Sequence, residues 1–249
     1  MLKEERQQLI LEKLGTDKKV TLVELGQLLN VSYDSVRRDV IELEDRGLLK
    51  KVHGGAIANS YLSMKASRGL GIANNEFNII TKKAQKLIEN HSIVLMDGGT
   101  TNFYIAEQLP KSLEITVVTN NPHLATALAE HPKIEVILLG GSFYKRYQIT
   151  LGSKTMQDLE HINADLYFMG INSIHSQKGL AIRQYEESLL KQKMMSVAKK
   201  TVSCVIEEKM NRVENYKVCD VDDLDYLVTS LNPNEKILQP FKGKSVEIL

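Results

Sequence analysis

Residues 21–40 read TLVELGQLLNVSYDSVRRDV, and this stretch predicts two short helices joined by a tight turn. Thr21 and Glu24 have the spacing of a capping box, in which both side chains satisfy backbone N–H groups of the first helical turn. The first helix runs to Leu29, and its inward-facing positions are Leu22, Leu25, Leu28 and Leu29. Two short helices with a turn of three or four residues between them predict a helix-turn-helix unit.

The second helix of the pair is expected from Tyr33 to Arg46, with Gly47 as its stop. Its apolar positions recur at helical spacing, as Val36, Val40 and Leu43. In a helix-turn-helix this helix enters the major groove of DNA, where its first residues reach base edges and phosphates. The candidate DNA-contacting residues in this region are Ser32, which also caps the helix, and Tyr33, Ser35, Arg37 and Arg38.

Two further elements complete the expected N-terminal unit. A helix precedes the pair at Glu5–Leu14, with Gly15 as its stop. After the pair, residues 48–57 alternate enough for two short strands that are basic at their tip. We interpret these strands as a wing and add Lys51 and His53 to the candidate DNA contacts.

The net charge of the chain gives no support for DNA binding, so this interpretation rests on the local pattern of charged residues. The 249 residues carry a formal net charge of +1, and residues 1–60 hold ten Lys or Arg side chains against ten Asp or Glu. Because exposed arginines on a helix are most often simply solvated, a plain helical bundle is the alternative. The candidate basic residues nevertheless lie apart from the acidic far end of their helix, at Glu42, Glu44 and Asp45.

The same composition excludes several other classes of protein. Hydrophobic residues make up 43% and charged residues 25% of the chain, as in ordinary globular proteins. Cys204 and Cys219 have no CxxC spacing and no histidine pair beside them, so we expect no metal site, no disulfide and no cofactor. No apolar run reaches about 20 residues and the first residues include acids, so we expect a cytoplasmic protein without a membrane partner.

From Ile79 onward, helix-like and strand-like segments alternate. Helices are expected at Ile79–Ile88, Asn102–Leu109, Pro122–Glu130, Ser153–Ile162 and Tyr185–Ala198. Strands are expected at Ile93–Asp97, Ile115–Thr119, Ile134–Leu139, Ala164–Gly170, Thr201–Ile206 and Leu224–Thr229. This alternation predicts an α/β domain with a mostly parallel sheet covered on both faces. We therefore expect a winged helix-turn-helix over residues 1–58, a linker over 59–78 and the α/β domain over 79–249.

Small and hydrogen-bonding residues follow three of the expected strands, at the end where parallel sheets bind ligands. The first group opens a helix, so its backbone N–H groups and threonine hydroxyls suit a phosphate. The three groups are Asp97-Gly98-Gly99-Thr100-Thr101, Thr119-Asn120-Asn121 and Gly140-Gly141. We expect them to converge on a phosphorylated small molecule, with further contacts from Lys178, Glu187 and Lys209. A structural role is equally open for Glu187 and Lys209, and Lys191 is expected to be solvated.

Two sets of motifs resemble those of the DeoR family of bacterial transcription regulators. The N-terminal set is Val31-Ser32-Tyr33-Asp34-Ser35-Val36-Arg37-Arg38-Asp39-Val40, followed by Leu43, Gly47 and His53-Gly54-Gly55-Ala56. The second set is the following, in order along the chain: Leu95-Met96-Asp97-Gly98-Gly99-Thr100-Thr101, Val117-Val118-Thr119-Asn120-Asn121, Leu138-Leu139-Gly140-Gly141, Leu151-Gly152, Ala164-Asp165 with Gly170, and Glu187 with Met194. The resemblance covers nearly the whole chain.

The resemblance implies that the second domain is similar to ribose-5-phosphate isomerase and senses a phosphorylated sugar. It also implies a repressor of a sugar-catabolism operon that binds double-stranded operator DNA and is relieved by its effector. Because specific operators are usually built from two half-sites, we expect a homo-oligomer, either a dimer or a tetramer. One departure occurs at Glu207-Glu208-Lys209-Met210, where the family commonly has Asp-x-Ser-Lys-Phe.

The alternative function is a sugar-phosphate isomerase with an appended DNA-binding domain, which requires a general base beside the bound sugar. In the isomerases the strand equivalent to Ala164–Gly170 leads into a pair of aspartates, whereas the residues here are Phe168-Met169-Gly170-Ile171-Asn172. Asp165 and Glu187 are still candidates for a single general base. We expect ligand binding without turnover, and therefore no catalytic residue.

Overall fold

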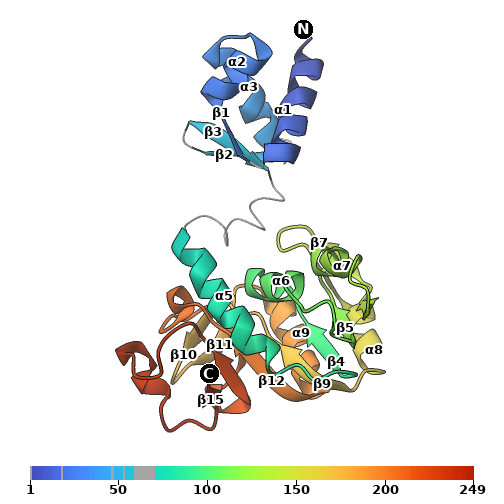
Figure 1. Ribbon diagram of the computed structural model, residues 1–249, viewed down its shortest axis with the longest axis vertical. Coiled ribbons are helices and arrows are strands. Elements are labelled where there is room, and N and C mark those ends of the chain that lie inside the picture. The colour runs from blue at the N-terminus through green and yellow to red at the C-terminus, as the bar shows by residue number, and fades with distance from the viewer. Residues whose placement is uncertain (1, 18, 46–47, 53, 59–70) are drawn as a thin grey trace. The chain divides into compact units, whose positions relative to one another are not determined.

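The computed structural model describes residues 2–17, 19–45, 48–52, 54–58 and 71–249 (Figure 1). It divides into two compact units, Met1–Gly71 and Ile72–Leu249. Each unit has a hydrophobic core of its own. No helix in these described ranges is long and apolar enough to cross a membrane.

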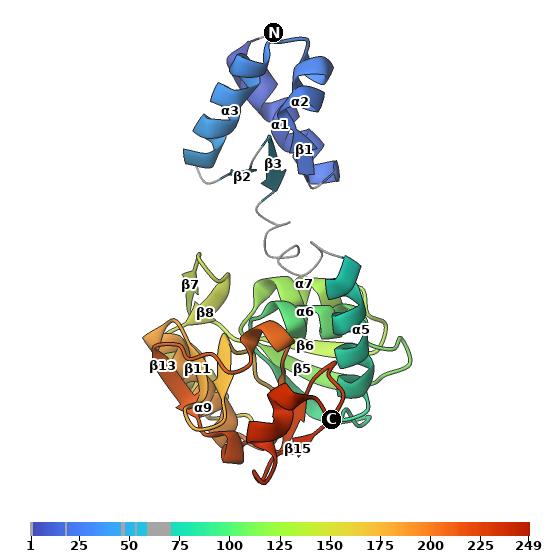
Figure 2. The same cartoon turned by 90° about the vertical axis from the view of Figure 1, so that its left-hand side faces the viewer.

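Three helices and a three-stranded antiparallel sheet form the described part of the N-terminal unit (Figure 2). Its elements are α1 (Lys3–Asp17), β1 (Lys19–Thr21), α2 (Leu22–Leu29), α3 (Tyr33–Asp45), β2 (Leu49–Val52) and β3 (Gly55–Ala58). The strand order is β1-β3-β2, so β2 and β3 form the expected wing and β1 extends it. A Cβ atom at Gly55 would lie 2.4 Å from the Val20 carbonyl oxygen, so only glycine lets β3 approach β1 this closely.

Capping and an ion pair hold the helices of this unit in place. The capping box is confirmed: the Glu24 N–H donates to Thr21 Oγ1, and the Thr21 N–H donates to the Glu24 carboxylate. Arg6 of α1 donates to both carboxylate oxygens of Asp39 on α3, a residue that is 2% exposed. This contact fixes α3 against α1 beside the core residues Ile10, Val36 and Val40.

The structure corrects two expectations for this unit. α1 continues through Gly15 to Asp17, because a glycine costs a helix interior only about 1 kcal/mol. Leu28 is 57% exposed rather than inward-facing, because the buried stripe of α2 consists of Leu22, Leu25 and Leu29. Gly47 and His53 lie outside the described residues.

A seven-stranded parallel sheet forms the second unit, in the order β15-β14-β12-β9-β4-β5-β6. Its strands are β4 (Ile93–Met96), β5 (Ile115–Thr119), β6 (Ile134–Leu138), β9 (Ala164–Phe168), β12 (Ala198–Cys204), β14 (Tyr226–Val228) and β15 (Glu247–Ile248). The predicted α/β architecture with a parallel sheet is therefore confirmed. All six expected strands are present, and β15 is an additional edge strand.

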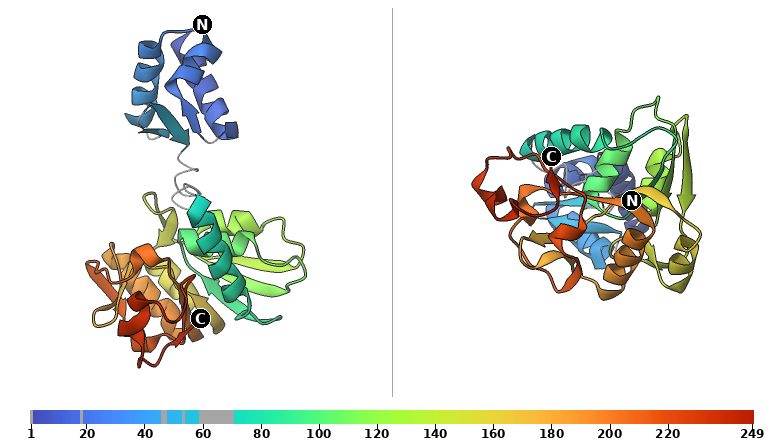
Figure 3. Two further views of the ribbon diagram at one scale, coloured as in Figure 1. Left: turned by 60° about the vertical axis from the view of Figure 1, so that its left-hand side comes forward. Right: turned by 90° about the horizontal axis from the view of Figure 1, so that it is seen from below.

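Helices cover both faces of this sheet (Figure 3). Neighbouring residues of a strand point to opposite faces, so Val94 belongs to one core cluster and Leu95 to the other. The first cluster includes residues of α5 (Gly71–Gln85), α6 (Thr100–Glu107) and α7 (Pro122–Leu128). The second includes residues of α8 (Ser153–Leu159) and α9 (Tyr185–Ser196).

Short antiparallel strands surround the main sheet, and the sequence analysis does not predict them. β7 (Ser142–Tyr144) pairs with β8 (Ile149–Leu151). A separate sheet joins β10 (Ser173–His175), β11 (Gly179–Ile182) and β13 (Tyr216–Cys219). Short 3-10 helices are present as η1 (Glu207–Lys209), η2 (Val221–Asp223) and η3 (Lys236–Phe241).

α5 begins earlier in the chain than the sequence analysis predicts. The expected linker covers residues 59–78, but residues 71–78 form the first half of α5, and the expected helix start at Ile79 lies in its middle. Phe77 explains the extension, because its side chain is 3% exposed and belongs to the packed part of the unit. Residues 59–70 lie outside the described ranges.

Candidate functional site

The exposed face of α3 is the candidate DNA-reading surface of the N-terminal unit. Tyr33, Arg37 and Arg38 are exposed on it, whereas the opposite face is buried at Val36, Asp39, Val40 and Leu43. Arg38 Nε donates to the Asp34 carbonyl at 3.3 Å. Arg37 makes no hydrogen bond or ion pair with any residue that the structure describes, so its guanidinium is available to a partner outside the chain.

The remaining candidates around α3 have other contacts. The Ser35 N–H donates to Ser32 Oγ at 3.3 Å, and the two serine hydroxyls lie 2.9 Å apart, so Ser32 caps α3 as predicted. Lys51 is partly buried on β2, and its backbone N–H donates to the Glu44 carboxylate. The structure thus gathers Ser32, Ser35 and the exposed residues of α3 at one end of that helix.

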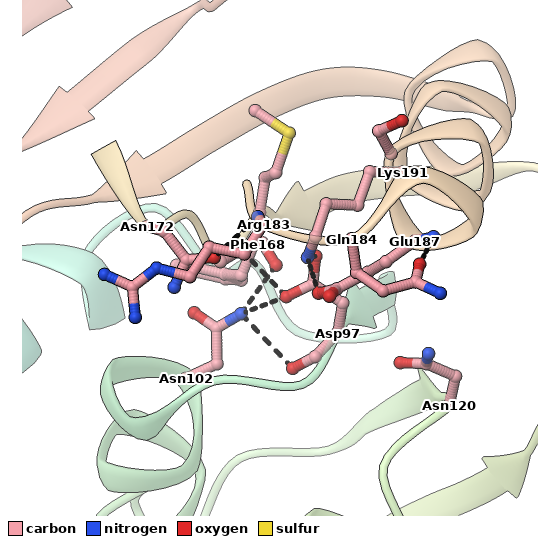
Figure 4. Close-up of polar contacts among 12 residues, drawn as sticks. Asp97, Asn102, Asn120, Phe168, Asn172, Arg183, Gln184, Glu187 and Lys191 are labelled. Carbon is pink, nitrogen blue, oxygen red and sulfur yellow. Dashed lines mark hydrogen bonds and ion pairs between the residues drawn. The ribbon is translucent and has the colours of Figure 1, made fainter. Parts of the chain in front are cut away.

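In the α/β unit, the polar centre is the carboxylate of Asp97, which follows β4 and is 1% exposed (Figure 4). Its Oδ1 accepts hydrogen bonds from the Gly170 N–H at 2.8 Å and from Asn102 Nδ2 at 2.9 Å. Its Oδ2 accepts from the Tyr167 hydroxyl and from Lys191 Nζ, each at 2.5 Å. Asp97 therefore joins β4, β9, α6 and α9. The sequence predicts that Asp97 contacts the ligand. In the structure, both of its carboxylate oxygens accept hydrogen bonds from protein donors.

Lys191 is a correction to the expectation of a solvated helix lysine. It is 1% exposed and lies between Asp97 and Glu187, whose Oε1 is 3.2 Å from Lys191 Nζ. Burial by itself would lower the pKa of Lys191, but the two carboxylates outweigh it and raise that pKa. Burial raises the pKa of Asp97, against the opposing effect of Lys191. Asp97, Glu187 and Lys191 form one buried cluster, called the charge cluster below.

The loop after Asp97 presents free backbone donors. α6 starts after Gly99 without a side-chain cap, and the N–H groups of residues 98–102 donate to no acceptor among the described residues. The hydroxyl of Thr101, a residue that is 5% exposed, likewise has no partner in the described part of the chain. A Cβ atom at Gly98 would lie 2.4 Å from Ile149 Cγ2, so glycine keeps this loop close to β8. Free amides at the positive end of a helix suit an anion.

The loop after β5 uses most of its polar groups for structure. Asn121 Oδ1 accepts from two backbone N–H groups at the start of α7, and Thr119 Oγ1 accepts from the Asn121 N–H. Asn120 Nδ2 donates to the Thr150 carbonyl of β8. Asn120 Oδ1 is buried without a partner in the described residues, so it is the one side-chain acceptor here that these contacts leave unused.

Gly140, Gly141 and Lys178 share no hydrogen bond with the charge cluster. Thr155 Oγ1 donates to the Gly140 carbonyl at 2.6 Å, and a Cβ atom at Gly141 would lie 2.3 Å from the same hydroxyl oxygen. Packing against α8 thus explains the second glycine. Lys178 is exposed in the turn between β10 and β11.

Lys209 lies in η1, the turn after β12, and is partly buried. Its amino group has no hydrogen bond or ion pair with the residues described here. Loss of hydration and the positive charge of Lys191 lower the pKa of Lys209 to about 8. The negative charge of Asp97 acts in the opposite direction and raises that pKa. Lys209 follows β12 at the edge of the parallel sheet where Asp97 follows β4. A partly buried amino group without a partner in the described residues suits an anionic ligand.

The two carboxylates left open as a general base are both engaged elsewhere. Asp165 is near the start of β9, where Oδ2 accepts from the Ile93 N–H and Oδ1 lies 2.7 Å from Lys199 Nζ. Because β4 and β9 are parallel, the start of β4 is at the opposite edge of the sheet from the loop after Asp97. Glu187 is paired with Lys191 in the charge cluster. Neither carboxylate is a free base beside the loop.

Two residues that hold Asp97 are missed by the sequence analysis, namely Asn102 and Tyr167. Asn102 Nδ2 also donates to the Phe168 carbonyl, so it ties the loop after β4 to the end of β9. Tyr167 is fully buried, and burial raises the pKa of its hydroxyl well above the ordinary value. The available signal was a tyrosine within an apolar strand, because a buried hydroxyl requires a partner.

Comparisons with known proteins match both units. The model of the DeoR-like helix-turn-helix domain matches residues 6–61, and that of the DeoR C terminal sensor domain matches residues 74–231. The HTH-type transcriptional repressor GlcR of Bacillus subtilis is 30% identical over 251 residues, which cover 100% of this chain and 96% of that protein. The putative aga operon transcriptional repressor of Escherichia coli O157:H7 is 27% identical over 251 residues, with coverages of 98% and 93%.

Among solved structures, ribose 5-phosphate isomerase A of Methanocaldococcus jannaschii matches with a TM-score of 0.40 and 13% identity, over 55% of each chain. A structural similarity with this TM-score carries no argument about the fold, which is defined by the parallel sheet itself. The curated relatives quoted above, in contrast, are both named as transcriptional repressors.

Proposed function

The chain belongs to the DeoR family of transcription regulators, and from this premise we propose that it is a repressor that leaves its operator when a phosphorylated sugar occupies the loop after β4. It is a regulator rather than an enzyme, as its relatives are named repressors. One relative is named as a putative repressor of the aga operon. We propose that this chain likewise represses an operon, one for the use of a sugar.

The observations that carry the proposal are the free amides at residues 98–102 and the unpaired amino group of Lys209, which follow β4 and β12 at the same edge of the parallel sheet. A phosphate ester accepts hydrogen bonds through three oxygens and carries about two negative charges, so it matches both features. The sugar part then lies beside the loop after β5, where Asn120 Oδ1 is unused. The charge cluster holds these loops in position without contacting the ligand.

The DNA-binding part of the proposal rests on the exposed face of α3. One helix offers only a few base contacts, so we propose that a homodimer or homotetramer presents two or more such helices to operator half-sites. We further propose that residues 1–58 bind the DNA and that the α/β unit senses the effector. Effector binding favours an arrangement of the DNA-binding units that fits the half-sites less well.

A thermal-shift screen of the purified chain tests the sensor half of the proposal. The panel contains ribose 5-phosphate, glucose 6-phosphate, other sugar phosphates and each unphosphorylated parent sugar. A ligand that binds only the folded state raises the melting temperature, so we expect one phosphorylated sugar to shift it and its parent not to. A shift by the parent sugar alone would contradict a phosphate-binding loop.

Effector affinity is expected to fall as the pH rises through about 8. The pKa of Lys209 is lowered to about 8 in the empty site, and a bound phosphate dianion stabilises the ammonium form and raises that pKa. Binding therefore takes up a proton above pH 8, and the dissociation constant rises by about tenfold per pH unit until the pKa of the bound state is reached. Calorimetric titration at pH 7, 8 and 9 with the sugar phosphate from the screen measures this effect.

Lys209→Arg is the matched control for the pH dependence. A guanidinium stays charged above pH 12, so this variant keeps a cation in the turn but loses the titration. We expect its dissociation constant to stay constant between pH 7 and 9. A wild-type affinity that is equally flat would place the Lys209 amino group outside the effector site.

A further inference from the structure

α5 is the first element of the α/β unit in sequence, and its residues 76–78 contact both sides of the proposed effector site. On one side, the ring of Phe77 lies 5.2 Å from the ring of Tyr104, measured between centroids. The Tyr104 hydroxyl donates to Asn78 Oδ1 at 3.4 Å. Tyr104 is on α6, one turn after Thr100, so these contacts join α5 to the helix that begins in the anion-binding loop.

On the other side, α5 holds the turn that carries Lys209. Glu76 Oε1 accepts a hydrogen bond from the Glu207 N–H at 2.9 Å and another from Ser230 Oγ at 3.1 Å. Glu207 is the first residue of η1, which ends at Lys209. The carboxylate of Glu76 therefore fixes the backbone of η1 two residues before Lys209.

The two halves of α5 are held in different ways. The C-terminal half is anchored by core packing, because Ile80 and Ala84 are fully buried. Lys83 Nζ adds a hydrogen bond to the Thr229 carbonyl at 2.8 Å. The N-terminal half is held by Phe77 and by the polar contacts of Glu76 and Asn78. Glu76 thus contacts η1, whereas Phe77 and Asn78 contact α6.

We propose that residues 76–78 of α5 are a coupling contact that carries occupancy of the effector site to the chain segment leading to the DNA-binding unit. The inference rests on the proposed function. A phosphate between Lys209 and the amides of residues 98–102 orders η1 and the start of α6 together. The contacts of η1 and α6 with residues 76–78 of α5 then become more stable. The N-terminal half of α5 is then held less firmly when the site is empty and more firmly when it is occupied. This difference acts on the segment immediately before α5 in sequence.

Hydrogen exchange on the full chain tests this coupling, with inorganic phosphate, ribose 5-phosphate and glucose 6-phosphate as separate probes against chloride at equal ionic strength. A probe that binds slows exchange of the amides of residues 98–102. In the wild type we expect the amides of residues 76–81 to slow as well, by about fivefold or more. In Glu76→Ala the loop is still protected, but the protection of residues 76–81 is lost.

Two variants control for the loss of a hydrogen bond in general. Glu76→Gln keeps an oxygen acceptor for Glu207 and Ser230, so it is expected to keep the coupling. Gln85 is at the other end of α5, and Gln85→Ala removes the hydrogen bond from Gln85 Nε2 to the Gln108 carbonyl. This variant is also expected to keep the coupling. Protection of α5 that is equal in Glu76→Ala and the wild type would overturn the inference.

DNA binding supplies the second readout, on a fragment that the wild-type chain selects from a random library. A probe that protects the loop is expected to weaken the DNA binding of the wild type by about tenfold. The same probe is expected to weaken the DNA binding of Glu76→Ala by about twofold or less. Equal weakening in both proteins, with the loop protected in both, would overturn the coupling role of Glu76 and leave the proposed function standing. Failure of all three probes to protect the loop would overturn the phosphate site and the inference with it.

Discussion

Asp97→Ala is expected to lower the free energy of unfolding of the α/β unit by about 3–5 kcal/mol. The substitution removes the closest counter-ion of Lys191, which is 1% exposed, and leaves it only the Glu187 carboxylate at 3.2 Å. It also removes the acceptor for the Tyr167 hydroxyl and the Gly170 N–H. Urea unfolding followed by circular dichroism measures the change, since the chain has no tryptophan to serve as a fluorescent probe.

Two further variants show how much of the loss comes from the broken charge pair of Asp97 and Lys191. Glu160→Ala removes an exposed carboxylate 4.0 Å from Lys193 Nζ and is expected to cost less than about 1 kcal/mol. The triple variant Asp97→Asn with Glu187→Gln and Lys191→Met removes all three charges of the charge cluster. It is expected to be more stable than Asp97→Ala, because no buried charge is left unpaired. An Asp97→Ala variant as stable as Glu160→Ala would show that Glu187 alone compensates the charge of Lys191.

The parallel sheet was predictable because its central strands are buried on both faces. Such strands appear as mostly apolar runs, such as IVLM at Ile93–Met96, and segments with helical periodicity separate them. The small strands lack both signals. β11 and β13 have four residues each and pair across more than thirty positions of sequence, so no local pattern announces them.

The candidate site was predictable in its loops but not in its buried centre. Glycine, threonine and asparagine after three strands indicate where a ligand binds, because strand ends of a parallel sheet meet at one edge. The role of Lys191 depends on a partner 94 positions away in sequence, Asp97, which no local pattern indicates. One usable signal was present: Glu187, Lys191 and Met194 share one face of α9, so a lysine lies within the buried stripe of that helix.

Arg37→Ala is expected to weaken operator binding by about 1–3 kcal/mol, which is roughly five- to 150-fold. Arg37 is exposed near the start of α3, one turn after Tyr33, and its guanidinium has no partner among the described residues. Arg38, in contrast, already donates to the Asp34 carbonyl. Binding to the selected DNA fragment at several salt concentrations measures the affinity and its salt dependence.

The salt dependence separates the two contacts that Arg37 can make. If its guanidinium binds a phosphate, Arg37→Ala weakens binding to all sequences alike and lowers the slope of log K against log salt by about 1. If it binds a base, the slope is kept and discrimination at one operator position is relaxed. Lys13→Ala removes the same charge from α1, where Lys13 is paired with Asp17, and is expected to leave operator affinity nearly unchanged. Equal behaviour of the two variants would mean that Arg37 acts only through the net charge of the unit and that another surface reads the operator.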